Sequence, residues 1–248
     1  MIKIRNKNAI YELLIGDVAF EKIVILAGLE QDDLTKAIVS EANKRQIPIE
    51  NTPYSKMAKR RDRESREAVL GILKRKESIT LKKLLGNLYE KDKEPFFLLL
   101  EKVDYSTNIG TIARTAFAAG VNGLIFQKDM NLVFNEDTIQ FSIGAIARIP
   151  LVKMNIFEAL KELKKNGIKI FTLDMEGSIY SNEDLKGPTA FVLGSEKEGV
   201  SDNISNRCDN KLSIPMKRGI DSLNVGSATS IILYEKVRQE GKGFFKKV

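Results

Sequence analysis

Histidine is absent from the 248-residue chain, and Cys208 is its single cysteine. The lack of histidine excludes Ser-His-Asp triads, Cys-His pairs and His-ligated zinc or iron. A lone cysteine cannot form an intramolecular disulfide, and the sequence has no cysteine cluster with metal-ligand spacing. We therefore expect no bound metal and a reducing compartment, and any catalysis must use other side chains.

Long apolar runs are missing as well. No stretch approaches the ~18 apolar residues of a membrane span, and the basic N-terminus lacks the apolar segment of a signal peptide. We therefore expect a soluble, cytoplasmic protein with no membrane partner. The motifs GxxxxGK[ST] and GxGxxG are also absent, so a nucleotide-like cofactor would need a pocket other than a P-loop or a dinucleotide fold.

Positive charge is present in excess and lies mainly in one stretch. The net charge is +7, and residues 51–93 contain thirteen basic and six acidic residues, a local balance of +7 that equals that of the whole chain. Such a basic stretch predicts a polyanionic partner, and we assign RNA contacts to Lys59, Arg60, Arg61 and Arg63. Because acidic residues are interleaved with the basic ones, a solvated helix face is the alternative.

The hydrophobic pattern predicts an α/β protein in three parts: a small α/β domain over 1–76, a linker helix within 77–93 and a larger domain over 94–248. The linker helix rests on four leucines at helical spacing, Leu81, Leu84, Leu85 and Leu88. In the larger domain strands alternate with helices, which predicts a mostly parallel sheet with ligands at the carboxyl ends of its strands. The elements expected are helices 9–14, 34–44, 110–119 and 155–166 and strands 22–27, 47–50, 95–100, 123–126, 168–173 and 190–193.

The first of three glycine-containing segments follows strand 95–100. Asn108 stands where a helix begins and is a candidate N-cap, and Arg114 lies six residues later in an otherwise apolar helix. An arginine is out of pattern there, which suggests function, although an arginine that reaches water is the alternative.

The other two segments follow later strands. In the second, Gly194 and Gly199 permit a tight backbone approach around Glu196. In the third, Pro215 and Gly219 mark a turn before Ser222, Leu223 and Asn224, which precede a helix expected to turn Ala228, Ile231 and Ile232 toward the core. Taken singly, Ser222 and Asn224 read as helix caps.

Together, Asn-x5-Arg, Gly-x-Glu-x-x-Gly and Ile-Pro-Met…Ser-Leu-Asn resemble, in order, the motifs of the SpoU or TrmH-like branch of the SPOUT RNA methyltransferases. The resemblance runs from Pro95 to the C-terminus. Residues 1–76, particularly 8–14, resemble the small substrate-binding domain that precedes the catalytic domain in many members. Many relatives have Asp-Pro before the asparagine, where this chain has Tyr105-Ser106-Thr107, so we expect a differently shaped loop.

The resemblance implies a C-terminal trefoil knot, a homodimer, S-adenosylmethionine as the cofactor and methylation of a ribose 2′-hydroxyl in RNA. It assigns cofactor binding to Gly194, Ile214, Leu223, Met216 and Thr172. It assigns catalysis to Arg114, as base or as electrostatic stabiliser, with Asn108, Glu196, Ser222 and Asn224 orienting the reacting groups.

The substrate class has alternatives. Ribosomal RNA is favoured, because the minimal tRNA enzymes of the family commonly lack the N-terminal domain. A tRNA 2′-O-methyltransferase keeps the chemistry and changes the RNA. A non-catalytic RNA-binding ribosome assembly factor is the alternative of another class, but it would not need Arg114, Glu196, Ser222 and Asn224.

Overall fold

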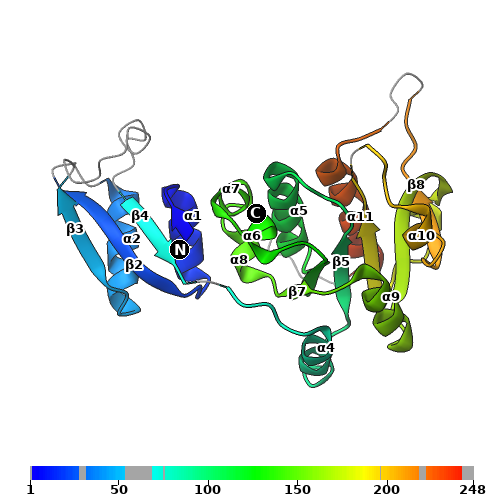
Figure 1. Cartoon of the computed structure of the whole chain (residues 1–248), viewed down its shortest axis with the longest axis horizontal. Helices are drawn as coiled ribbons and strands as arrows, with labels where there is room; N and C mark the ends of the chain where they lie inside the picture. Colours follow the sequence, from blue (N-terminus) through cyan, green and yellow to red (C-terminus); the bar gives the residue numbers. More distant parts are fainter. Residues whose placement is uncertain are drawn as a thin grey trace.

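The computed structural model describes residues 2–27, 32–53, 69–74, 76–195, 197–217 and 222–241. Two β-sheets lie at opposite ends of an elongated molecule and are joined by a segment that carries one helix (Figure 1). The predicted mixed α/β fold is confirmed.

The N-terminal sheet has four strands in the order β1-β4-β2-β3. Strands β2 and β3 are parallel, and the two other pairings are antiparallel. Asn6 and Asp32 cap the two helices of this domain by accepting hydrogen bonds from main-chain N–H groups. The elements are β1 (Ile2–Ile4), α1 (Lys7–Ile15), β2 (Phe20–Ala27), α2 (Asp33–Lys44), β3 (Ile49–Pro53) and β4 (Val69–Leu73).

The larger sheet has six strands, all parallel, in the order β10-β8-β9-β5-β6-β7. The predicted parallel sheet is therefore confirmed. Its strands are β5 (Phe96–Leu100), β6 (Gly123–Phe126), β7 (Leu151–Lys153), β8 (Lys169–Ile179), β9 (Thr189–Leu193) and β10 (Asn210–Ser213).

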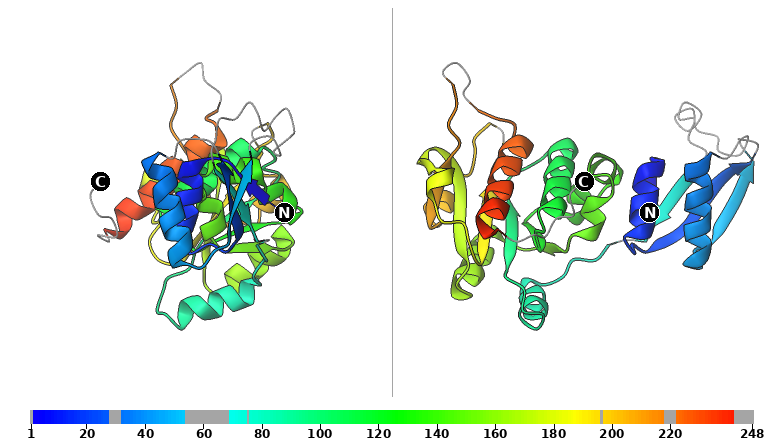
Figure 2. Two further views of the ribbon diagram at one scale, coloured as in Figure 1. Left: turned by 90° about the vertical axis from the view of Figure 1, so that its left-hand side faces the viewer. Right: turned by 180° about the vertical axis from the view of Figure 1, so that it is seen from behind.

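Both faces of this sheet are covered. Along β5, Phe96 and Leu98 belong to one apolar core, whereas Phe97 and Leu99 belong to a second core on the opposite face. Since alternate residues of a strand point to opposite faces, every side chain of β5 is buried. Helices α5 (Ser106–Ala118) and α11 (Val225–Glu240) pack side by side over the first core, as the view from behind in Figure 2 shows.

The second core is closed by α4 (Leu81–Tyr89) and α9 (Ile156–Lys165), with α10 (Asp202–Ser205) beside them. The four leucines of the predicted linker helix are all buried in α4 and pack on this face. Asn155 caps α9, as its sequence predicts, by accepting hydrogen bonds from Phe157 and Glu158.

Several expectations need correction. Helix α5 begins at Ser106, and β8 runs on to Ile179. In α11, Ile232 is buried, but Ala228 and Ile231 are only half-buried, because α11 lies at the edge of the core. The sequence did not predict β1, β4, β7, β10, α10 or the short helices α6 (Met130–Val133), α7 (Glu136–Phe141), α8 (Ala145–Arg148) and η2 (Tyr180–Asn182). The trefoil knot stays a prediction.

Candidate active site

The loops that follow β5 and β9 lie together at the carboxyl edge of the larger sheet. The two strands are parallel neighbours, and Glu101 N donates to Leu193 O over 2.8 Å. The Glu101 carboxylate then accepts hydrogen bonds from Ser201 N at 2.9 Å and Ser201 Oγ at 2.6 Å. The first two glycine-containing segments are therefore joined where a parallel sheet places its ligands.

Gly194 can only be glycine in this fold. A Cβ at Gly194 would lie 2.0 Å from the carbonyl carbon of Gly199. The two main-chain bonds between Ser195 and Gly199, both 3.0 Å, close the loop, and Gly199 has a φ of +66°. The glycines thus serve the close backbone approach predicted for them. Glu196 lies outside the described residues.

A hydrogen bond between two asparagines brings the first and third segments together. Asn224 caps α11, because its Oδ1 accepts from Gly226 N at 2.9 Å. Its Nδ2 donates to Asn108 Oδ1 at 3.1 Å. Asn108 is therefore not the N-cap that the sequence predicts: Tyr105 holds that position without a side-chain bond, and the Asn108 amide turns toward α11 instead. A second bond, 3.1 Å between Thr115 Oγ1 and Ser230 Oγ, also links α5 to α11.

Arg114 lies on the exposed side of α5. Six residues along an α-helix correspond to a turn of roughly 120° away from Asn108. The buried side of α5 carries Asn108, Ile112 and Ala113, whereas Thr111 and Phe117 share the exposed side with Arg114. The sequence pattern of this helix therefore did not reveal its exposed side. Arg114 lies on that side, so the structure does not bring it together with Asn108.

A pocket of about 300 Å³ opens between the loops after β5 and β9. Asn108 and Gly194 line it, as does Val225 at the start of α11. Tyr105, part of the loop expected to differ from that of relatives, lines it too, and the remaining lining residues, which the sequence did not mark as site residues, are Lys102, Val103, Asp104, Ser195, Lys197 and Glu198. Their position directly after buried strands was the feature that could have identified them. Asp104 forms an ion pair with Lys128, whose pKa burial lowers.

The other predicted cofactor residues are placed differently. Thr172 is buried within β8 instead of at its end, pairs with Val192, and donates to the Val192 carbonyl at 3.5 Å. It marks only the point where β9 stops pairing with β8, because β8 runs past the end of β9. Ile214 packs against the core, whereas Met216 and Leu223 are exposed beside residues 218–221, which are not described. Ser222, which the resemblance assigns to catalysis, is exposed at the same place.

No group of three or more potential metal ligands occurs among the described residues, and no helix in that part of the chain is long and apolar enough to span a membrane. Burial raises the pKa of the Cys208 thiol to about 12, so this cysteine is a poor nucleophile at neutral pH.

Residues 95–234 match the SpoU rRNA methylase family. The chain belongs to this family. A relative assigned by name to the TrmH family of tRNA/rRNA methyltransferases, from Staphylococcus saprophyticus, is 30% identical over 96% of this chain and 96% of its own length.

Two solved structures of SpoU-type enzymes resemble the fold over different lengths. The SpoU methyltransferase AviRb from Streptomyces viridochromogenes, in complex with the cofactor AdoMet, has a TM-score of 0.79 and 21% identity and covers 97% of this chain and 91% of its own. A TrmH/SpoU tRNA modifying enzyme of A. aeolicus has a TM-score of 0.55 and 28% identity and covers 64% of this chain and 85% of its own.

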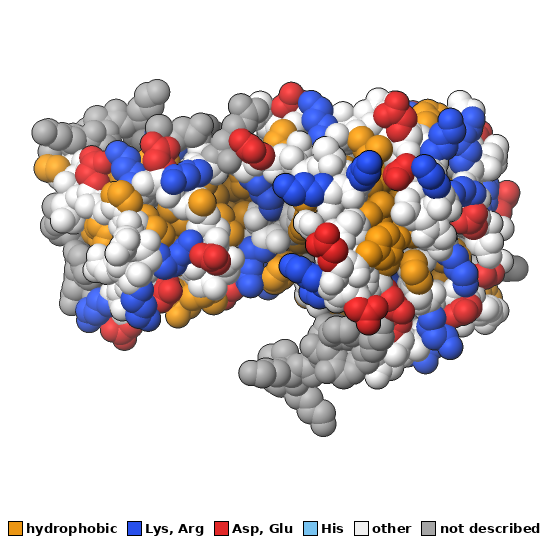
Figure 3. All heavy atoms as spheres, turned by 90° about the horizontal axis from the view of Figure 1, so that it is seen from below, with side chains coloured by type: hydrophobic (Ala, Val, Ile, Leu, Met, Phe, Trp, Pro, Cys, Tyr) orange, Lys and Arg blue, Asp and Glu red, His pale blue; other side chains and the backbone are white. Residues whose placement is uncertain are grey.

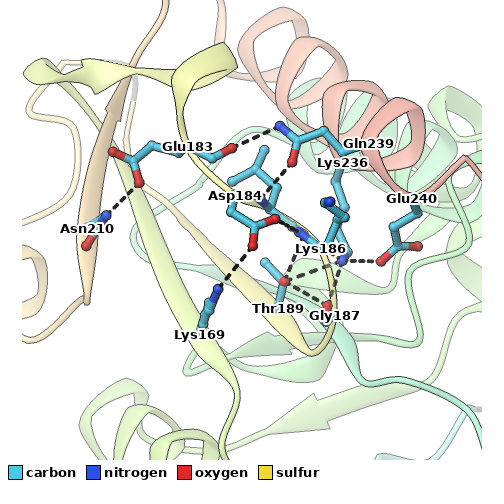
Figure 4. Close-up of polar contacts among 11 residues, drawn as sticks. Lys169, Glu183, Asp184, Lys186, Gly187, Thr189, Asn210, Lys236, Gln239 and Glu240 are labelled. Atoms are coloured by element: carbon cyan, nitrogen blue, oxygen red, sulfur yellow. Dashed lines mark hydrogen bonds and ion pairs between the residues drawn. The ribbon is translucent and has the colours of Figure 1, made fainter.

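In this member of the SpoU family, a buried lysine joins α11 to the start of β9, at the ends of these two elements that lie away from the site. Lys236 on α11 is 2% exposed, and its Nζ donates to the carbonyls of Leu185 and Gly187 at 2.9 and 2.7 Å and pairs with Glu240 at 2.5 Å (Figure 4). Its Nζ also lies 3.4 Å from Thr189 Oγ1, where β9 begins. Since Asn224 caps the start of α11 and β9 ends directly before Gly194, the Lys236 ammonium group joins two elements whose other ends reach the site.

Proposed function

We propose that the protein transfers the methyl group of S-adenosylmethionine to a ribose 2′-hydroxyl of ribosomal RNA. The observation that carries this proposal is the Asn224–Asn108 hydrogen bond beside the Gly194 loop. It assembles the first and third family motifs at one edge of the parallel sheet, next to the second. Family membership supports methyl transfer to RNA.

The chain's residues fit such a cofactor. Val103 and Val225 give the pocket apolar walls, Asn108 gives it an amide, and Gly194 brings main-chain groups close without a side chain. Apolar walls with a few polar main-chain and side-chain groups suit an adenosyl ligand. When bound, S-adenosylmethionine supplies an electrophilic methyl group, and the in-line geometry of the acceptor oxygen dominates the rate.

Arg114 acts as an electrostatic group in this proposal. Its exposed guanidinium is a planar cation with several N–H donors, so it binds phosphate and stabilises the developing alkoxide. Its position on the exposed side of α5 suits a homodimer in which Arg114 reaches the pocket of the partner subunit. Light scattering should then report twice the monomer mass.

Ribosomal RNA is favoured by the share of the chain that the solved structures cover. An rRNA methyltransferase from Sinorhizobium meliloti resembles 96% of the chain, whereas the A. aeolicus tRNA modifying enzyme resembles only 64% of it. A second domain beside the catalytic one suits the larger RNA.

The test is methyl transfer followed by mapping of the product. The protein is incubated with labelled S-adenosylmethionine and unmodified bacterial 16S, 23S or transfer RNA, and 2′-O-methyl sites are mapped by resistance to alkaline cleavage. We expect one nucleotide of ribosomal RNA to become resistant. Methylation of tRNA alone, or of a base, would refute the proposed substrate or position, and no transfer to any RNA would refute the enzyme.

Arg114→Ala should lower this transfer by about 10²–10³-fold, the usual cost of losing one oxyanion-stabilising donor, and leave S-adenosylmethionine binding unchanged. Lys161→Ala, an exposed position on α9 of the opposite face, is the matched control and should retain full activity. Activity of Arg114→Ala within a few fold of the unsubstituted protein would remove Arg114 from the mechanism.

A further inference from the structure

The N-terminal domain, which contains β1 to β4, packs directly against two short helices of the domain that contains the six-stranded sheet, here called the catalytic domain. Gly144, at the N-cap of α8, has a φ of +81°, and a Cβ there would lie 2.8 Å from Cγ of the buried Leu13 on α1. Arg5, directly after β1, forms an ion pair with Glu136 on α7. Figure 1 shows α1 beside α7 and α8. This backbone approach leaves no room for a side chain at Gly144.

One arginine spans the contact and reaches the helix that carries the site. Arg148 is the last residue of α8, and its Nη1 lies 3.7 Å from Glu12 Oε2 on α1. Its guanidinium carbon lies 4.2 Å from the centre of the Phe117 ring on α5. A Cβ at Gly16, the C-cap of α1, would lie 2.5 Å from Arg148 Nε. Arg148 thus contacts α1 of the N-terminal domain and α5 of the catalytic domain at the same time.

The chain between the domains is attached at the same place. Lys76 Nζ donates to the carbonyls of Ile146, Ala147 and Ile149 at 3.3, 2.6 and 2.5 Å. These are the carbonyls at the end of α8, where a positive charge is favourable. Ile79 N donates to Leu151 O of β7 at 2.9 Å, so the connecting segment follows the catalytic domain instead of bridging open solvent.

The contact continues to the pocket. A Cβ at Gly110, in the first half of α5, would lie 2.5 Å from Phe141 Cβ on α7, so α5 and α7 approach as closely as a glycine allows. Gly110 is two residues from Asn108. The N-terminal domain, α7, α8 and α5 therefore form one packed body.

We infer that this docking sets the distance between the RNA segment that the N-terminal domain captures and the ribose that the catalytic domain methylates, with Arg148 as the positioning residue. The inference rests on the proposed function. A rigidly docked domain raises the effective concentration of the target ribose only for an RNA that spans both sites at this separation. Long, folded RNA benefits, whereas a short oligonucleotide that contains only the target nucleotide does not.

The kinetic test compares Arg148→Ala with Arg207→Ala. Arg207 also lies over a phenylalanine ring, that of Phe157 at 4.9 Å, but on the opposite face of the sheet, so it is a matched control. We expect Arg148→Ala to raise KM for 23S or 16S ribosomal RNA about tenfold. Its kcat, its S-adenosylmethionine binding and its activity on a short oligonucleotide should not change. Arg207→Ala should change none of these quantities.

A second variant guards against misfolding. Glu12→Arg places a like charge beside Arg148 at a part-exposed position and should give the same KM effect. An unchanged KM in both variants would overturn the inference, as would an equal loss on long and short RNA.

The physical test needs no RNA. Spin labels are attached at Lys36→Cys on α2 and Lys161→Cys on α9, both exposed positions, in a Cys208→Ser background. The inter-label distance distribution should be narrow, and Arg148→Ala should broaden it. A broad distribution before substitution would show that the domain is not docked, whatever the protein methylates. A narrow distribution in a protein that methylates no RNA would instead refute the proposed function alone.

Discussion

The two domains differ in how many polar side chains they bury. Among the described residues, Thr35 is the one buried polar side chain of the N-terminal domain, and the others all lie in the catalytic domain. Both domains carry ion pairs at their surface, such as Lys22–Glu50 at 2.5 Å in the N-terminal domain and Lys164–Asp209 at 2.7 Å in the catalytic domain. In the catalytic domain, Lys236 is buried and fully engaged.

This contrast follows from what each part does in the proposed function. Methyl transfer requires reacting groups in one fixed geometry, and buried polar contacts specify a unique arrangement because a mispaired group inside the protein is costly. An RNA-capturing domain needs charge at its surface and tolerates adjustment. On the face in Figure 3, basic and acidic side chains are intermixed, so the described surface in that view forms no large patch of one charge.

Replacing the buried lysine should have the largest effect. Lys236→Met removes the ammonium that donates to the Leu185 and Gly187 carbonyls, which keep only the Thr189 hydroxyl between them, and it leaves the Glu240 carboxylate without this ion pair. The substitution should lower the free energy of unfolding by about 4 kcal/mol. Lys22→Met in the exposed Lys22–Glu50 pair is the matched control and should change it little. Urea unfolding followed by circular dichroism measures both. Equal losses in the two variants would erase the contrast between the domains.

The sequence alone could not reveal Lys236. In the segment Tyr234-Glu-Lys-Val-Arg238, its charged neighbours suggest an exposed helix end, and only the packing of α11 on the 183–189 loop buries the lysine. Arg114 is the opposite case. Arg114 looked misplaced because its helix seemed apolar on all sides, but it is exposed. The outer side of α5 also carries small apolar side chains such as Ala118, and these hid the exposed side in the sequence.

What the sequence did predict were features set by local pattern. Buried runs such as 96–100 became strands of the parallel sheet, and their order brought the first two glycine-containing segments to one edge. The Asn108 cap was wrong, because its amide finds a tertiary partner in Asn224. The short helices α6 to α8 and α10 were missed, because four to six residues carry too little periodicity to detect.

The buried Lys76 at the junction between the domains should make the free energy of unfolding depend on pH. Burial lowers the pKa of Lys76 from 10.5 to about 8. Between pH 8 and pH 10.5 the unfolded chain binds more protons than the native protein, so the free energy of unfolding rises with pH over this range. The contribution of Lys76 to stability is therefore complete above pH 10.5 and is lost as the pH falls through 8. Unfolding free energies of the unsubstituted protein and Lys76→Met should therefore diverge in favour of the former by about 2 kcal/mol between pH 8 and pH 10.

The exposed Lys74 provides the control for this titration. Lys74→Met should follow the unsubstituted protein across the same pH range, because the Lys74 side chain stays in contact with water in the folded protein. If Lys76→Met shows the same pH dependence as Lys74→Met, the Lys76 ammonium is not desolvated in solution, and the junction resembles the surface pairs of the N-terminal domain.

The basic segment gives the smallest expected effect and the sharpest separation of capture from chemistry. Lys59, Arg60, Arg61 and Arg63 lie outside the described residues, and their contact with RNA stays a prediction of the charge pattern. Each phosphate contact adds roughly 0.7–0.9 to the fall in log K per tenfold rise in salt. Replacing all four by alanine should flatten the salt dependence of RNA binding by at least one such contact, without changing S-adenosylmethionine affinity or the free energy of unfolding.

Substitution tests this better than truncation, because removing everything before Glu94 would also remove α4 and expose the apolar face that Leu84, Leu85 and Leu88 cover. Filter binding of labelled ribosomal RNA over a series of salt concentrations gives the slope, and calorimetry gives the cofactor affinity. The control replaces Lys161, Lys164 and Lys165 of α9 and Lys169 at the start of β8 by alanine, which also removes four positive charges but from the other domain. If both sets flatten the slope equally, RNA attraction comes from the overall charge of the protein, and the division of labour between the two domains is wrong.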